Sequence, residues 1–99
     1  MEHLEHLEAP PMTGHANRRL AQRAITGKAV KAAMLEGRVI LSHGGRKIFF
    51  LGDNEVRKAR SQGMDLKPYR NVMVVMAPCG TILTVVKTKH VPKGRTLLS

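Results

Sequence analysis

At 99 residues, the chain is long enough for one folded domain with a modest core and too short for two. A hydrophobic fraction of 42% argues against intrinsic disorder, and an aromatic fraction of only 3% means that the core is aliphatic. The single cysteine excludes an internal disulfide, and no run approaches the ~18 apolar residues that a membrane span requires. The formal charge of +10 favours a polyanionic partner such as nucleic acid.

The charge is divided unevenly along the chain. Residues 1–12 carry three Glu and no Lys or Arg, whereas residues 13–99 hold all 17 Lys and Arg against 4 acids, a balance of +13. We interpret residues 1–12 as a flexible acidic tail, because Pro10 and Pro11 separate them from the rest. With no apolar signal segment and a lone cysteine suited to a reducing compartment, the chain is expected in the cytoplasm, although a toxin piece cut from a larger secreted chain would look the same.

Two short helices are expected at the start of the folded part. Thr13 is placed to cap a helix over residues 14–24, and small or apolar residues recur there at a spacing of four: Ala16, Leu20 and Ala24. Thr26 is a second capping residue, ahead of residues 27–36. Gly37 follows that segment as the residue expected to end the second helix.

The remaining pattern predicts strands and one more helix. Gly44 and Gly45 lie between two strand-like runs, which is typical of a β-hairpin. Residues 54–63 predict a third short helix, capped by Asp53 or Asn54. Two nearly continuous apolar runs then predict central strands that are buried on both faces: residues 71–77 and 81–88.

The predicted fold class is therefore α+β. Two N-terminal helices pack on a mainly antiparallel four-stranded sheet within a single domain over residues 13–90. Residues 91–99 are interpreted as a basic C-terminal tail.

The first predicted helix carries the most distinctive cluster of side chains. Four basic residues share one face of it: His15, Arg18, Arg19 and Arg23. Like charges at this spacing destabilise a helix unless an anion or a carboxylate neutralises them, and residues 13–35 contain no acid. Because Arg matches phosphate geometry, the cluster predicts a phosphate site. The alternative is a solvent-facing basic stripe in which His15 has no role.

Metal and cofactor chemistry are not expected. The five His residues are dispersed, and no pair in the folded part has metal-ligand spacing with a second ligand cluster. Gly44 and Gly45 do not form a phosphate-binding glycine loop, because no helix opens directly after them. We therefore predict neither a metal site nor a cofactor.

Two stretches of the sequence carry a family resemblance: HANRRLAQRAI near the start and VVMAPCGTILTVVKT near the end. With Val30, Ala33 and Gly37 between them, they resemble a family of small bacterial domains of unknown function. That family looks like a branch of the barnase–EndoU–colicin–RelE superfamily of RNase toxins. The resemblance spans residues 13–88 and implies a RelE-like fold.

The resemblance implies metal-independent cleavage of RNA, in which the ribose 2′-OH attacks the neighbouring phosphate and leaves a 2′,3′-cyclic phosphate. It assigns catalysis to three residues: His15, Arg19 and Thr84. His15 would act as proton acceptor or donor, and Arg19, with Arg23, would hold the scissile phosphate. Thr84 would position the phosphate or the 2′-OH by hydrogen bonding. Four further cations would bind the substrate: Arg18, Arg23, Arg46 and Lys87. Strand alternation places Lys87 on the opposite sheet face from Thr84.

The sequence leaves two other functions open. One is a module with the same scaffold that binds RNA without cleaving it. The other is a module whose basic face binds an acidic protein. An acidic antitoxin or immunity protein is the expected protein partner of the toxin-like enzyme.

Overall fold

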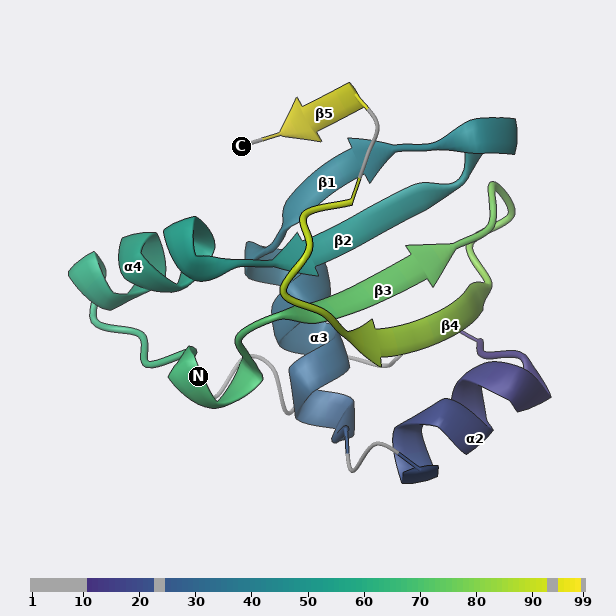
Figure 1. Ribbon diagram of the computed structural model, residues 1–99, viewed down its shortest axis with the longest axis horizontal. Coiled ribbons are helices and arrows are strands. Elements are labelled where there is room, and N and C mark those ends of the chain that lie inside the picture. Colours follow the sequence, from purple (N-terminus) through teal and green to yellow (C-terminus); the bar gives the residue numbers. More distant parts are fainter. Residues whose placement is uncertain (1–10, 23–24, 93–94, 99) are drawn as a thin grey trace.

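The computed structural model describes residues 11–22, 25–92 and 95–98, with the backbone alone for residues 19–22 and 95–98. Figure 1 shows one sheet with a helix packed behind it and further helices beside it. The helices are α2 (Gly14–Gln22), α3 (Gly27–Glu36) and α4 (Asp53–Ser61), with short 3-10 helices η1 (His43–Gly45) and η2 (Lys67–Tyr69). The strands are β1 (Arg38–Leu41), β2 (Lys47–Leu51), β3 (Val72–Met76), β4 (Ile82–Lys87) and β5 (Arg95–Leu98).

The sheet is antiparallel throughout, in the order β4-β3-β2-β1-β5. The chain is therefore an α+β protein, and the two helices and four strands expected from the sequence are all present. A fifth strand, β5, pairs with β1 and lies within residues 91–99, which the sequence indicated only as a tail. Within the described residues, no helix is long and apolar enough to cross a membrane.

The main core lies between α3 and the sheet. The side chains of Ala29, Val30, Ala32 and Ala33 on α3 are buried, and the helix packs on β2 and β3. Small alanines let the helix backbone approach the strands closely. Thr26 caps α3 as predicted, because its Oγ1 accepts a hydrogen bond from the Ala29 N–H at 3.1 Å.

Gly37 ends α3 as predicted, but for a different physical reason. Its backbone is extended, with φ at −77°, so no left-handed turn requires a glycine. A Cβ at this position would instead lie 3.0 Å from the carbonyl oxygen of Phe50 and would clash with that of Ala33. The close approach of helix end and strand is what requires a glycine here.

Gly37→Ala is expected to destabilise the protein by about 1–3 kcal/mol, because the backbone has to move to admit the Cβ. Gly27→Ala is the matched control, since a Cβ there meets nothing within 4 Å. Thermal unfolding followed by circular dichroism checks both. Equal midpoints for Gly37→Ala and wild type would show that the packing is not tight at this point.

The two apolar strands differ from the prediction. β3 is central, with Val72, Val74 and Met76 buried on the helix side. β4 lies at the sheet edge, so its assignment as a central strand is wrong. Its apolar run arises because Ile82 and Val85 enter the core, while α2 packs beside the strand.

The cap of α4 also differs from the prediction. The helix begins at Asp53 and its N-cap is Gly52, not Asp53 or Asn54. The Glu55 Oε1 accepts the Gly52 N–H at 3.0 Å, which satisfies a backbone donor at the helix start. A Cβ on Gly52 would meet the Phe50 ring at 2.7 Å, so the position favours glycine over the usual polar cap.

Candidate nucleic-acid interface

The start of α2 is fixed against the beginning of β4. The Thr13 Oγ1 accepts the Ala16 N–H at 3.1 Å and donates to the Leu83 carbonyl oxygen at 3.1 Å. The Thr13 N–H also donates to the Ile82 carbonyl oxygen at 3.0 Å. Thr13 therefore caps the helix as predicted and holds it on the strand that carries Thr84.

His15 and Arg18 are exposed on α2, on either side of the fully buried Ala16 along the sequence. Arg19 lies on the same helix, where only its backbone is described. Arg23 lies outside the described residues. The structure thus places two of the four residues of the predicted basic face on the surface of the first helix.

Thr84 and Lys87 lie on opposite faces of the sheet, as alternation predicted. Thr84 pairs with Val75 and is half-buried on the face away from α3. Lys87 pairs with Val72, a fully buried residue of the helix-side core, and is itself exposed. Because they lie on opposite faces, the two side chains cannot contact the same phosphate.

Arg46 is exposed at the tip of the β1–β2 hairpin, directly after η1. A Cβ on Gly45 would lie 3.2 Å from the Pro78 ring, so this tip meets the turn between β3 and β4. That turn precedes Ile82, whereas Lys87 ends β4 five residues later, about 17 Å away at the rise of a strand. Arg46 and Lys87 therefore lie at opposite ends of the sheet, and one phosphate cannot contact both.

Lys87 belongs instead to a group of cations at its own end of the sheet. An open depression of about 370 Å³ is lined by the following residues: Lys67, Pro68, Arg70, Asn71, Lys87, Thr88 and Lys89. Four of the seven are cationic and none is acidic. We call this the acid-free depression.

Backbone hydrogen bonds hold the two halves of this depression together. The Thr88 N–H donates to the Asn71 carbonyl oxygen at 2.9 Å, and the Asn71 N–H donates to that of Leu51. Asn71 has a φ of 69°, a left-handed conformation that Asn tolerates better than most residues. The His90 N–H donates to the Thr88 Oγ1 at 3.1 Å, which fixes the backbone on either side of Lys89.

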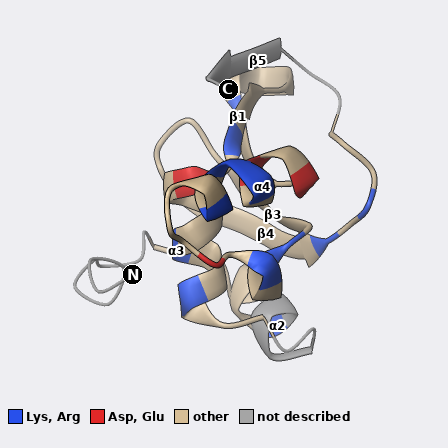
Figure 2. Ribbon diagram, turned by 90° about the vertical axis from the view of Figure 1, so that its left-hand side faces the viewer, with Lys and Arg blue, Asp and Glu red and all other residues tan. Residues whose placement is uncertain are grey.

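The acidic side chains near the depression already have partners within the protein. Glu55 pairs with Arg38 at 3.4 Å, and the Asp65 carboxylate accepts the Lys67 N–H at 3.2 Å. The Asp53–Arg70 pair is 3.6 Å apart with both side chains at least half exposed, so solvent screens it and Arg70 can still receive an anion. Figure 2 shows that Lys and Arg outnumber acids on this side of the molecule.

The other depressions around these cations are less favourable to an anion. One of about 500 Å³ beside α4 contains Asp65 with Arg57 and Arg60. Another, of about 240 Å³, contains Asp53 and Glu55. Since carboxylates repel phosphate, the acid-free depression is the stronger candidate for a phosphate contact.

The sequence pointed to only one of the four cations in this depression, Lys87. Lys67, Arg70 and Lys89 were missed, because residues 67–71 and 87–89 come together only when β3 pairs with β4. The local motifs KPYR and KTKH are basic but short, and nothing in either one indicates the other. No group of His, Cys, Asp or Glu that could hold a metal ion occurs among the described residues.

Cys79 is exposed in the turn between β3 and β4, outside the acid-free depression. A hydrogen bond to the Thr81 hydroxyl, at 3.4 Å, lowers the pKa of the thiol because it stabilises the thiolate.

No family model, curated protein or solved structure matches the chain. The resemblance to RNase toxin domains therefore remains a prediction from sequence motifs.

Proposed function

We propose that the protein binds RNA through its cationic surface, with the acid-free depression as the main contact for the phosphate backbone. The observation that carries this proposal is the convergence of Lys67, Arg70, Lys87 and Lys89 with no acid in the lining. Cations that neutralise phosphates release condensed counterions, which supplies much of the affinity of such complexes. The choice of RNA over DNA rests on the resemblance to RNase toxin domains.

The direct test is titration of a fluorescein-labelled, unstructured RNA oligonucleotide with the purified protein, followed by fluorescence anisotropy. Binding is expected to weaken steeply between ~50 and ~200 mM salt, with a slope of log affinity against log salt near −3 for four phosphate contacts. DNA of the same sequence is the control that shows whether the protein distinguishes ribose from deoxyribose. Undetectable binding at low salt would rule the proposal out.

RNA cleavage is a second candidate function. The observation that favours it is that His15 and Arg18 are exposed on a helix that Thr13 fixes to the strand of Thr84. An imidazole can accept or donate a proton near neutral pH, and an arginine can stabilise a pentacoordinate phosphate. In this arrangement α2 holds the reacting phosphate and the acid-free depression holds the strand farther along.

An acidic protein partner, such as an antitoxin or immunity protein, would compete with RNA for the same cations. Competition in the anisotropy assay separates this partner from one that binds elsewhere on the protein.

A further inference from the structure

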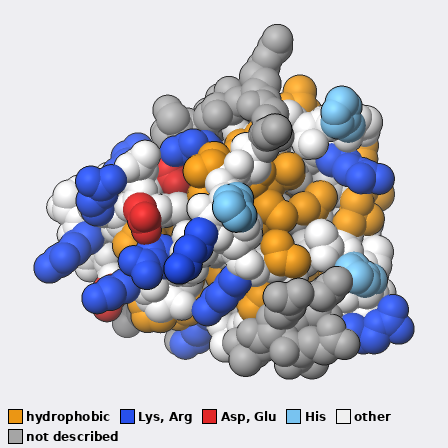
Figure 3. All heavy atoms as spheres, in the orientation of Figure 1, with side chains coloured by type: hydrophobic (Ala, Val, Ile, Leu, Met, Phe, Trp, Pro, Cys, Tyr) orange, Lys and Arg blue, Asp and Glu red, His pale blue; other side chains and the backbone are white. Residues whose placement is uncertain are grey.

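The sheet has one face that no described helix covers, which we call the open face. Its side chains follow from the strand pairing: Ile48 faces Val75, Phe50 faces Met73, Val75 faces Thr84 and Met73 faces Val86. Ile40, Ile48 and Phe50 form a small second core there, with Met73 and Val75 packed against it. Figure 3 looks onto this face and shows a continuous group of apolar side chains over the strands.

The chain itself covers only part of the open face. After β4, residues 88–92 cross in front of β3 and β2 (Figure 1), where Lys89 and Val91 line a depression with Phe50. Met73, Val75 and Val86 remain half-buried, and Val91 is 56% exposed. An apolar surface of this kind, rimmed by polar groups, is typical of an interaction site.

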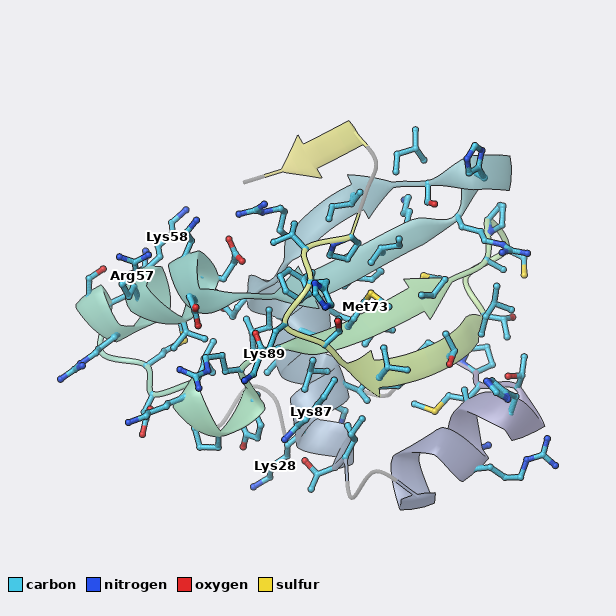
Figure 4. All side chains as sticks on the ribbon, in the orientation of Figure 1. Lys28, Arg57, Lys58, Met73, Lys87 and Lys89 are labelled. Carbon is cyan, nitrogen blue, oxygen red and sulfur yellow. The ribbon has the colours of Figure 1, made fainter. Side chains whose placement is uncertain are left out.

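The open face has cations at both ends, and the two acids beside it are already paired, Glu55 with Arg38 and Asp53 with Arg70. Lys89 lies at the Met73 end of the face (Figure 4), Arg46 precedes Ile48 at the other end, and Lys87 belongs to the helix-side face. Arg38 is opposite Phe50 and is paired with Glu55, whose other oxygen accepts the Gly52 N–H. The surface therefore fits a ligand that is apolar in the middle and acidic at both ends.

The chemistry of the face favours a protein over nucleobases. Bases stack on exposed aromatic rings, and the one aromatic ring of this face, Phe50, is only 2% exposed. Apart from Thr84, its partly accessible side chains on the strands are apolar and include Met73, and methionine adapts its shape to other apolar side chains. The molecule measures 34 × 28 × 23 Å, enough for about four turns (~21 Å) of a helix.

We infer that the open face is a docking surface for an acidic amphipathic helix of a partner protein. Leucine-like side chains of that helix pack on Met73, Val75 and Val86. Its carboxylates pair with Lys89 at one end of the face and with Arg46 at the other. The two surfaces share Lys89, but Met73, Val75 and Val86 do not line the acid-free depression, so helix docking is tested separately at Met73.

The probe is a synthetic helical peptide with a leucine stripe on one side and glutamates on the other. Its control is a peptide of the same composition with the leucines scrambled, so that both carry the same charge. Binding to the full chain is followed by anisotropy and by the methionine methyl NMR spectrum, in which Met73→Leu assigns the Met73 signal. We expect about tenfold tighter binding of the amphipathic peptide and a shift of the Met73 signal on binding.

Met73→Glu is expected to remove the tenfold preference, whereas Leu35→Glu, on an α3 side chain that is 46% exposed, preserves it. Equal affinity for the two peptides, an unmoved Met73 methyl signal or an equal effect of Leu35→Glu would each overturn the inference. If the RNA oligonucleotide, and not the peptide, moves the Met73 signal, the face contacts bases and the inference is also wrong. The wild-type NMR result stands even if Met73→Glu does not fold.

Discussion

Replacing Lys87 and Lys89 together by Gln is expected to weaken RNA binding about tenfold at low salt. Both side chains line the acid-free depression, and both are exposed. Their removal leaves Lys67 and Arg70 to hold the phosphates, so half of the proposed contacts remain. The slope of log affinity against log salt should fall in magnitude from about 3 to about 1.5. Anisotropy titrations at several salt concentrations measure both quantities.

The matched control replaces Lys31 and Lys58 by Gln. This variant loses the same total charge, but neither residue lines the depression. It is expected to bind nearly as tightly as wild type and to keep the wild-type slope. An equal loss in both double variants would mean that RNA responds only to net charge, which contradicts a localised phosphate contact. Undetectable binding by the wild type would contradict the proposed function itself.

The parts of the fold that the sequence predicted are those with local causes. Thr13 and Thr26 cap their helices because a hydroxyl accepts an N–H three residues later, a pattern confined to one turn. The β1–β2 hairpin follows from Gly44 and Gly45, both of which adopt positive φ. Such features depend on a few neighbouring residues, so the sequence alone is sufficient to predict them.

The errors concern packing between distant segments. The edge position of β4 depends on the strand order of the sheet. A central strand and an edge strand that packs beside a helix can both have a nearly continuous apolar sequence, so the sequence does not distinguish the two positions. The pairing of β5 with β1 joins residues more than 50 positions apart through only four residues. Gly52 takes the place of a polar N-cap residue because a Cβ there would meet the Phe50 ring. A rule based on capping residue types does not include such a contact.

The candidate site likewise has one part that a local pattern predicts and one part that depends on distant segments. The basic face of α2 is a helical pattern, and the sequence therefore predicted His15 and Arg18 together. The acid-free depression needs the hydrogen bond between Thr88 and Asn71 to bring its two halves together. Lys87 was predicted through a family resemblance, yet its neighbours and its face of the sheet assign it to this depression.

His15→Ala is expected to abolish RNA cleavage, with a loss of about 10²-fold or more, if His15 transfers a proton in the reaction. Ala is a good helix former and His15 is exposed on α2, so the variant should fold like wild type. The assay incubates cellular RNA with the protein in EDTA and resolves the products by electrophoresis. Chemical analysis of the ends should find 2′,3′-cyclic phosphate and 5′-hydroxyl groups, the products of attack by the ribose 2′-OH.

His43→Ala is the control for this prediction, because His43 is also exposed but lies on η1 in the β1–β2 hairpin. It should cleave at the wild-type rate. Intact RNA with the wild-type protein would eliminate the ribonuclease and leave RNA binding alone, since the binding test does not require catalysis. Equal cleavage by wild type and His15→Ala would point to a contaminating nuclease or to a different proton-transfer group. Because binding through the acid-free depression should survive His15→Ala, measuring both activities on one variant separates chemistry from affinity.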